Sequence, residues 1–322
     1  MTTPAVRSIR KNFPQAHISM LAKPWVAPVF ENSTHVDAVL IYDGSGCHKG
    51  IWGRVRLARE LRPYHFEAAI LLQNAFEAAL ITFLAGIPCR IGYNTDGRSL
   101  LLTHPVACKP EYKKDHQTRY YLNILRGVGL KEGSQDLFLN LDSKQRERAR
   151  EILFKHGLSK QARIIGINPS ATYGPAKQWP FERYAGLADK IQDFVDSRVL
   201  IFGGPEDIQL GRRISQMMKH APVDLSGKTE LGEAMALIER CSLFITNDSG
   251  LMHVAAALNV PLIAIFGSTN ATTTGPLSSN SRIVQVPMVC SPCLKPECPE
   301  GHLNCMSQID VDMVFNIAKE ML

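Results

Sequence analysis

The 322-residue sequence contains no apolar run that approaches the ~20 residues needed to span a membrane, and VPLIAIFG at 260–267 is only as long as a strand. Basic residues occur in Met1–Lys11, but no apolar stretch follows them, which argues against a secretory signal. Only eight cysteines are present, too few for a disulfide scaffold, so the expected compartment is the reducing cytoplasm. No repeat of roughly 20–50 residues and no low-complexity tract occurs.

The composition is that of an ordinary globular protein large enough for two domains, with 45% hydrophobic residues. Its positive excess lies in residues 1–150, which hold 21 Lys and Arg against 13 Asp and Glu, whereas residues 151–322 hold 15 against 17. A basic half suits an anionic partner such as a phosphorylated glycolipid, an acidic membrane surface or nucleic acid, although scattered solvated charges give the same count. The basic segments lack interleaved aromatic residues and any nucleic-acid motif, so we expect no nucleic-acid partner.

Strand-like and helix-like segments alternate along the chain, which predicts an α/β fold with parallel sheets. The clearest predicted strands are Arg163–Asn168, Arg198–Phe202, Leu243–Thr246 and Pro261–Phe266. A polar helix at 143–156 precedes them, so we place the boundary between a first domain, 1–155, and a second domain, 156–322, that ends in a helix. The first domain begins in a helix, not in the strand and ligand-binding turn that usually open such a domain.

The strongest local motif is SLFITNDSGLMHVAAAL at 242–258, a buried strand that runs through Asn-Asp-Ser-Gly directly into a helix. Asp248 or Ser249 can cap this helix, and Gly250 lets another group approach the backbone closely. A helix N-terminus at the end of a parallel strand offers free N–H groups and partial positive charge, which suits a phosphate. His253 lies about one turn further along the same face. Alternatively, Asp248 is only a cap and His253 only a core residue.

A second loop, NPSATYGPAKQW at 168–179, also follows a strand. Its Thr172 can hydrogen-bond a phosphate oxygen, and its Lys177 can place a point charge there. A lone loop lysine is usually only a solvated charge, but two such loops at neighbouring strand ends favour a diphosphate site. After the next strand, a glycine turn leads to Asp207, which is placed to accept ribose hydroxyls. A GxGxxG fingerprint is absent, and SGKT at 226–229 is not a P-loop because Pro222 stands where glycine is required.

Four cysteines lie within 16 residues near the C-terminus, and His302 lies among them. The set is Cys290, Cys293, Cys298 and Cys305. This spacing could ligate a structural zinc ion tetrahedrally, in a closed site that implies no catalytic role. Disulfides or unliganded thiols are the alternatives.

Together, these segments resemble the ADP-heptose:lipopolysaccharide heptosyltransferases of glycosyltransferase family 9, and within it heptosyltransferase II. The resemblance covers nearly the whole chain and rests on FPQAHISMLAKPW, LQNAFEAALITFLAGIPCRIGY, YGPAKQWPFERYAGLA, LSGKTELGEAMALI and NDSGLMHVAAALNVPLIAIFG. It implies the GT-B architecture, in which two Rossmann-like domains with parallel sheets face a cleft. The first domain would receive the lipopolysaccharide inner core, and the second would bind ADP-heptose. The implied reaction is an inverting, metal-independent heptose transfer in core oligosaccharide biosynthesis.

The resemblance also implies which residues contact the diphosphate. Lys177 lies where the family's diphosphate-binding lysine lies, and it would neutralise the leaving ADP with help from Thr172. Ser249 and Gly250 match the backbone amides that hold the diphosphate.

The remaining matches concern the sugar and the nucleoside. Asp248 and His253 match positions that face the sugar. Asp207 lies at the acidic ribose-binding position, and Thr229 lies where the backbone meets adenine. The main rival within this class is a UDP- or GDP-linked sugar as the donor.

Family members begin with an apolar strand and a Gly-Asp turn, whose aspartate is the general base, and a Met-Thr-Thr-Pro-like segment follows that turn. This sequence opens at Met1-Thr2-Thr3-Pro4, so we expect the strand and the base to precede residue 1 in a truncated or misassigned reading frame. Glu31 and Asp37 are in the wrong place for the base. The alternative function is therefore a catalytically impaired protein that binds the nucleotide-sugar, and we expect a destabilised first domain.

The segment IWGRVRLARELRP at 51–63 predicts a helix with four arginines, Arg54, Arg56, Arg59 and Arg62. Such a helix could lie against the inner membrane surface or the phosphates of the acceptor, which would make the protein a peripheral membrane protein. A solvated helix face would show the same pattern.

Overall fold

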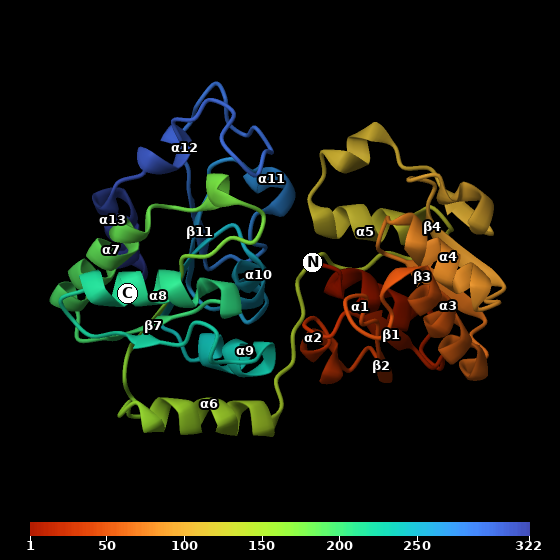
Figure 1. Ribbon diagram of the computed structural model, residues 1–322, viewed down its shortest axis with the longest axis horizontal. Coiled ribbons are helices and arrows are strands. Elements are labelled where there is room, and N and C mark those ends of the chain that lie inside the picture. The colour runs from red at the N-terminus through yellow and green to blue at the C-terminus, as the bar shows by residue number, and fades with distance from the viewer. The chain divides into compact units, whose positions relative to one another are not determined.

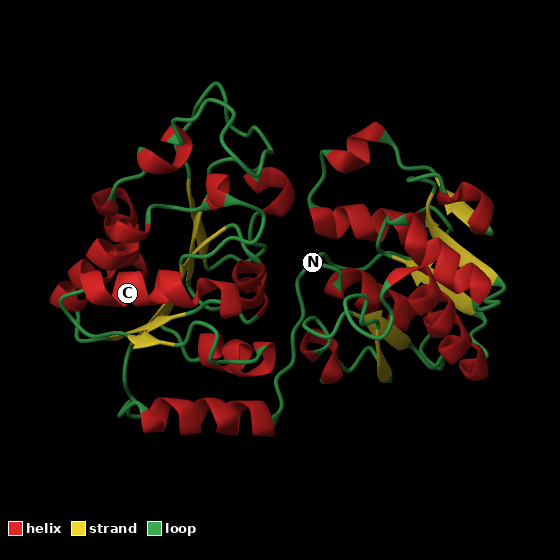
Figure 2. Ribbon diagram, in the orientation of Figure 1, coloured by secondary structure: helices red, strands yellow, loops and turns green.

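The computed structural model describes every residue from Met1 to Leu322, and the chain divides into two compact units, Met1–Gln135 and Asp136–Leu322 (Figure 1). All strand pairings in both units are parallel. Helices flank the strands within each unit (Figure 2). The α/β fold with parallel sheets that the sequence predicts is therefore confirmed.

The second unit is built on one six-stranded sheet with the order β11-β10-β9-β6-β7-β8. Its strands are β6 (Ile164–Asn168), β7 (Arg198–Ile201), β8 (Val223–Asp224), β9 (Leu243–Asn247), β10 (Leu262–Ile265) and β11 (Ser281–Val284). Numbered from the start of this unit, the order is 3-2-1-4-5-6, which is the Rossmann order. Every residue of β6, β9 and β10 is buried, since helices cover both faces of a parallel sheet, and these strands are accordingly almost wholly apolar.

The helices of this unit cover the sheet and complete its core. They are α6 (Ser143–Lys155), η4 (Pro175–Lys177), α7 (Phe181–Phe194), η5 (Pro205–Asp207), α8 (Ile208–Met217), α9 (Leu231–Glu239), α10 (Gly250–Ala257), α11 (Ala271–Thr274), α12 (Asn304–Ser307) and α13 (Val311–Met321). Leu187 of α7 and Val314 of α13 belong to one fully buried cluster with Ile165 and Ile263 of the sheet. Burying a side chain of this size contributes about 1.5–3 kcal/mol, so this cluster dominates the stability of the unit.

The polar helix α6 belongs to the second unit, which changes the domain boundary. Its Ala149 and Leu153 are buried, and Arg146 donates to both carboxylate oxygens of Glu239 on α9, each at 2.8 Å. The division therefore falls before α6, at residues 135–136, and not after it at residues 155–156. In the sequence this helix reads as a boundary because most of its residues are charged. Two buried apolar side chains and its ion pairs are enough to attach it to the second unit.

The first unit carries its strands in two separate sheets. One pairs β1 (Ser19–Ala22) with β2 (Ala38–Ile41), and the other has the order β3-β4-β5, with β3 (Ala68–Leu71), β4 (Cys89–Tyr93) and β5 (His104–Val106). The helices are α1 (Thr3–Asn12), α2 (Pro28–Glu31), α3 (Gly50–Leu61), η1 (Arg62–Tyr64), α4 (Phe76–Leu84), η2 (Arg98–Leu101), η3 (Pro110–Lys113) and α5 (Gln117–Arg126). β1 and β3 each pair with a single strand, and most of their residues are only partly buried.

One arginine is fully buried in the first unit, at the ends of β3 and β4. Arg98 Nε donates to the Tyr93 carbonyl at 2.8 Å, and its terminal nitrogens reach the Gln73 carbonyl and Asn74 Oδ1. Desolvation lowers the pKa of this guanidinium, which nevertheless stays charged because an arginine pKa lies so far above neutrality. Its hydrogen bonds tie the loops after β3 and β4 together.

No helix in either unit combines the length and the apolar character that crossing a bilayer would require.

We expect the first unit to open more readily than the second, because its strands bury fewer of their residues. β4 and β6 make a matched comparison, since each has five residues and a strand on both sides. Hydrogen exchange of the intact chain, followed by mass spectrometry, should show peptides of β4 exchanging at least about tenfold faster than those of β6. Equal protection of the two strands would contradict this expectation.

Candidate functional site

The candidate site lies at the carboxyl end of the second unit's sheet, where the strand order reverses. β6 and β9 are neighbours there, with β7 beyond β6 on one side and β10 beyond β9 on the other. Open α/β sheets bind ligands in the crevice outside such a reversal. The loop after β6 carries Thr172 and Lys177, and β9 leads into Asp248 and Ser249. The two strongest sequence motifs are therefore brought to one place.

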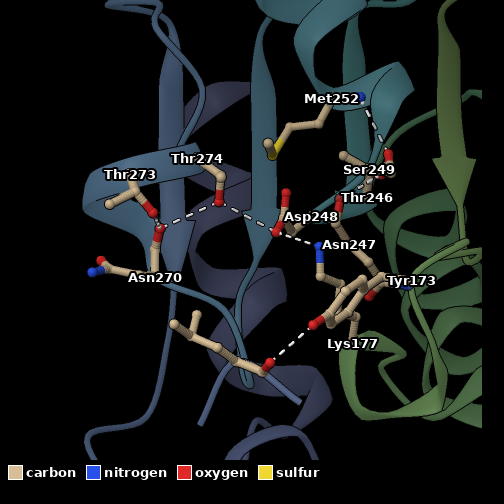
Figure 3. A network of polar contacts seen from close by, with 11 residues as sticks. Tyr173, Lys177, Thr246, Asn247, Asp248, Ser249, Met252, Asn270, Thr273 and Thr274 are labelled. Atoms are coloured by element: carbon tan, nitrogen blue, oxygen red, sulfur yellow. Dashed lines mark hydrogen bonds and ion pairs between the residues drawn. The ribbon is translucent and has the colours of Figure 1, made fainter. Parts of the chain in front are cut away.

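Lys177 and Asp248 form an ion pair that joins these two loops. Lys177 Nζ lies 2.8 Å from Asp248 Oδ2, and the two side chains are only 14% and 6% exposed. Thr274 Oγ1 donates to the same carboxylate oxygen at 3.4 Å, and the Lys177 ammonium lies 5.0 Å from the centre of the Tyr173 ring (Figure 3). A nearly buried charge is costly without a partner, so the carboxylate stabilises this lysine and holds it in place.

Ser249, not Asp248, caps the helix that follows β9. Its hydroxyl accepts from the Met252 amide at 3.3 Å, which satisfies one of the open N–H groups of α10. The Asn168 side-chain amide donates to the same hydroxyl at 2.9 Å and so attaches the cap to β6. No atom lies within 4 Å of where a Cβ on Gly250 would stand. The start of α10 is therefore accessible to a ligand, and Asp248 is left to pair with Lys177.

A buried amide fixes the loop that carries the lysine. Asn247 Oδ1 accepts from the Trp179 backbone amide at 3.1 Å and from the Tyr184 hydroxyl at 3.0 Å. The Nδ2 group of Asn247 donates to the Pro169 carbonyl at 2.7 Å. Burial raises the pKa of the Tyr184 phenol far above its usual value, so this group stays a neutral donor. Both ends of the loop are thus anchored to the residue that ends β9.

The other predicted residues occupy the same edge of the sheet. Thr172 is exposed in the loop after β6, and His253 is half-buried in the first turn of α10. Asp207 follows β7, where its Oδ2 accepts from the Gly204 amide at 2.7 Å and closes the turn before α8. Thr229 is half-buried in the loop after β8. One oxygen of Asp207 therefore has a structural role that the sequence does not reveal.

Three further residues of the site are not identified from the sequence. Tyr173 faces Lys177, Thr274 contacts Asp248, and Asn247 anchors the loop. Tyr173 lies inside the motif already singled out, and Thr274 belongs to STNATTTG, a hydroxyl-rich segment directly after a buried strand. That position after β10 is the signal that could have drawn attention to Thr274.

All eight cysteines are free thiols. The four clustered ones line a single cavity of about 10 Å³, together with Ala176, Ser268 and His302. As they stand, no three His, Cys, Asp or Glu side chains of the chain form a group that could hold a metal ion. The cysteines form no disulfide, and four of them share one cavity.

The two acids considered for a general base lie in the first unit. Asp37 accepts from the Ile18 amide at 2.7 Å and pairs with Arg10. The Ile18 hydrogen bond and, after it, the Arg10 hydrogen bond hold the pKa of this carboxyl below its usual range, which weakens it as a base. Glu31 ends α2 and is exposed. The hydrogen bonds of Asp37 therefore make it a poor candidate for the general base.

Comparisons with known proteins agree with this geometry. The family model described as glycosyltransferase family 9 (heptosyltransferase) matches residues 54–304. The lipopolysaccharide heptosyltransferase 2 of Escherichia coli K12 is 31% identical over 332 residues, which cover all of this chain and 94% of that protein. The lipooligosaccharide heptosyltransferase 2 of Haemophilus influenzae is 33% identical, over 87% of this chain and 83% of that protein.

Solved structures extend the agreement to the fold. ADP-heptose lipopolysaccharide heptosyltransferase II from E. coli superposes with a TM-score of 0.82 at 27% identity, over 99% of this chain and 93% of that one. A family 9 glycosyl transferase from Veillonella parvula gives a TM-score of 0.90 at 27% identity, over 99% and 92% of the two chains. The α/β architecture expected from the sequence is accordingly that of GT-B enzymes. The chain belongs to glycosyltransferase family 9, the heptosyltransferases.

Proposed function

We propose that this chain is a glycosyltransferase that moves heptose from ADP-heptose to the inner core of lipopolysaccharide. The observation that carries the proposal is the Lys177–Asp248 pair beside the open start of α10. It puts a cation and free backbone amides together where a leaving diphosphate can be held. The names of the relatives, lipopolysaccharide or lipooligosaccharide heptosyltransferase 2, support heptose as the sugar and the lipopolysaccharide core as the acceptor.

In the transfer, the oxygen of an acceptor hydroxyl attacks C1 of the heptose on the face opposite the nucleotide, and the bond from C1 to the diphosphate oxygen breaks. The hydroxyl proton passes to a general base that is neither Glu31 nor Asp37. Negative charge then builds up on the leaving ADP. Lys177 exchanges its contact with Asp248 for a phosphate oxygen, while Thr172 and the backbone amides of Ser249 and Gly250 donate to the phosphates. This scheme stabilises the leaving group with a lysine and a helix N-terminus, without requiring a metal ion.

The remaining residues of the edge bind the rest of the donor. Asp207, at the end of β7, accepts a ribose hydroxyl, and the backbone at Thr229, after β8, contacts adenine. Asp248 and His253 face the heptose. This order follows the sheet from β9 across β6 and β7 to β8, which is the direction in which an extended nucleotide-sugar would lie.

The acceptor side of the proposal rests on the first unit. Its residues 1–135 hold 17 Lys and Arg against 10 Asp and Glu, a net charge of +7, which suits a phosphorylated lipid on an anionic membrane surface. On α3 and the residue after it, three of the four arginines are engaged within the protein. Arg54 pairs with Glu77, Arg62 donates to the Leu84 carbonyl, and Arg56 donates to the Cys47 carbonyl at 3.5 Å.

The outer face of α3 is both basic and aromatic. Trp52 is 80% exposed and Ile51 is 63% exposed, and the exposed Arg56 and Arg59 follow Trp52 at helical spacing. Tryptophan and arginine together are typical of surfaces that lie in a membrane interface. We therefore assign this face to peripheral contact with the anionic inner membrane surface.

Lys177→Ala should lower kcat/KM for heptose transfer by about 10²–10³-fold, because the charge on the departing ADP loses its cation. Lys219→Ala is a matched control, since this lysine is 72% exposed and pairs with Asp193 away from the site. Transfer to purified inner-core acceptor is followed by mass spectrometry, and ADP binding is measured separately by calorimetry. Turnover of Lys177→Ala close to that of the control would refute the assigned role.

Asp248→Asn should separate binding from transfer. The substitution removes a negative charge next to the diphosphate, so we expect ADP to bind several-fold more tightly at low salt. Transfer should slow by about tenfold or more, because the lysine and the heptose lose the carboxylate that positions them. Thr274→Val is the matched control: it removes a hydrogen bond to the same carboxylate without changing charge, and ADP affinity should stay within about twofold of the wild type. Weaker ADP binding by Asp248→Asn would contradict this account.

The pair Trp52→Ser and Arg56→Glu should reduce sedimentation of the protein with anionic phosphatidylglycerol vesicles by about tenfold, with little effect on neutral vesicles. Phe154→Ser with Lys155→Glu makes the same kind of change on α6, where Phe154 is 82% exposed, and should have no such effect. Equal vesicle binding by both double variants would remove α3 from the proposed membrane contact.

A further inference from the structure

The cysteine-rich segment, residues 290–305, lies directly against the loop that carries Lys177. The Tyr173 hydroxyl donates to the Leu294 carbonyl at 2.9 Å, and the Ala176 amide donates to the Pro296 carbonyl at 3.0 Å. Between them, Gly174 has a φ of 153°, and a Cβ there would lie 2.3 Å from the Pro296 oxygen. Only glycine permits this close approach, so the loop that carries Lys177 and the cysteine-rich segment pack in direct backbone contact.

This segment has little of its own to hold it in shape. It has no helix or strand between the end of β11 at Val284 and the start of α12 at Asn304. Leu294 and Leu303 have positive φ angles of 55° and 52°, a conformation that costs of order 1 kcal/mol or more at each non-glycine residue. Ser291 donates to the Gly267 carbonyl, and the Leu294 amide donates to the Ser268 carbonyl. Few contacts therefore support two strained positions.

The four cysteines line one cavity of about 10 Å³ in this segment, together with Ala176, Ser268 and His302. Four thiols that lie within 16 residues of the chain are thus gathered around a single space. The site combines four soft donors with a cavity of the size that a single ion requires.

The donor set fits a thiolate-binding metal. Four thiolates in a tetrahedral arrangement suit zinc or iron, whereas calcium and magnesium require oxygen ligands, and we commit to zinc because four cysteines at short spacing are typical of structural zinc sites. His302 also lines the cavity, and its Nδ1 accepts from the Asn304 amide at 3.0 Å; we take Cys305, the fourth thiol around the cavity, as the fourth ligand. Because no three of these side chains yet form a group that could hold an ion, binding must draw the sulfurs inward. The cavity between them provides the space for that movement.

We propose that Cys290, Cys293, Cys298 and Cys305 bind one structural zinc ion, and that the segment closed by this ion holds the Lys177 loop in position. The first part of this proposal is independent of the transferase function. The second part rests on it, because it assigns a consequence to the position of Lys177. The link is specific: the segment contacts the loop through the backbone of residues 294 and 296, between the second and third ligands.

The zinc site is tested on the full chain purified without chelators. We expect about one zinc ion per chain in the wild type and in the control Cys47→Ser with Cys89→Ser, and about a tenth of that or less in Cys290→Ser with Cys293→Ser. Replacement of zinc by Co²⁺ should give the near-ultraviolet sulfur-to-cobalt absorption of a four-thiolate site in the wild type only. The zinc site is overturned if the wild type, after addition of zinc, holds no more zinc than Cys290→Ser with Cys293→Ser. An intact mass lower by two hydrogens per cysteine pair, which would show disulfides, also overturns it.

The effect on Lys177 is tested by ADP binding. Loss of zinc, by chelation or in Cys290→Ser with Cys293→Ser, should weaken ADP binding by about tenfold while circular dichroism shows the second unit still folded. Tyr173→Phe, which removes the hydrogen bond to Leu294 but keeps the ring beside Lys177, should weaken it by a smaller factor. Unchanged ADP affinity after zinc loss overturns the positioning role. Absence of heptose transfer by the zinc-loaded wild type would instead refute the proposed function. It would leave the zinc site standing, because the zinc content is measured separately.

Discussion

The nearly buried ion pair between Lys177 and Asp248 joins the two loops on either side of the strand reversal, and the surrounding contacts serve to keep it assembled. Each charge is nearly buried and is stabilised by the other, so the pair ties the positions of the two loops to one another. Ser249 takes the helix cap, which releases Asp248 for the lysine, and Asn247 anchors both ends of the lysine loop. The site is therefore organised in the absence of a ligand, and in the proposed function a phosphate would replace the carboxylate as the partner of the lysine.

The two units show different balances of burial and charge. The second unit encloses its central strands completely and is close to neutral, which suits a rigid platform for a nucleotide. The first unit has two small sheets with partly exposed strands, and it carries the positive excess of the chain. Small sheets and positive charge suit the binding of a large anionic acceptor through many weak contacts. They suit less well the binding of a small ligand in a deep pocket, which requires a rigid frame.

Much of this organisation can be predicted from the sequence, for identifiable reasons. The sequence predicts the strands β6 and β9 to within one residue at each end, because apolar β-branched runs beside turn residues have few alternative structures. The motif around Asp248 locates the site but leaves the cap open, because Asp and Ser cap helices equally well. Tyr173 and Thr274 could not be assigned, since the hydrogen bonds of Tyr173 to Leu294 and of Thr274 to Asp248 join residues far apart in the sequence. The polarity of α6 concealed its domain for the same reason: its partners, such as Glu239, lie on another helix.

The buried Arg98 has an electrostatic consequence for the first unit. Its hydrogen bonds go to carbonyl and amide oxygens, and the carboxylate of Asp96 acts on its charge only through space. The charge does not vary over the pH range in which the protein is folded, because an arginine pKa lies so far above neutrality. The ends of β3 and β4 therefore keep one fixed cation, whose field Asp96 offsets in part and salt screens outside the protein.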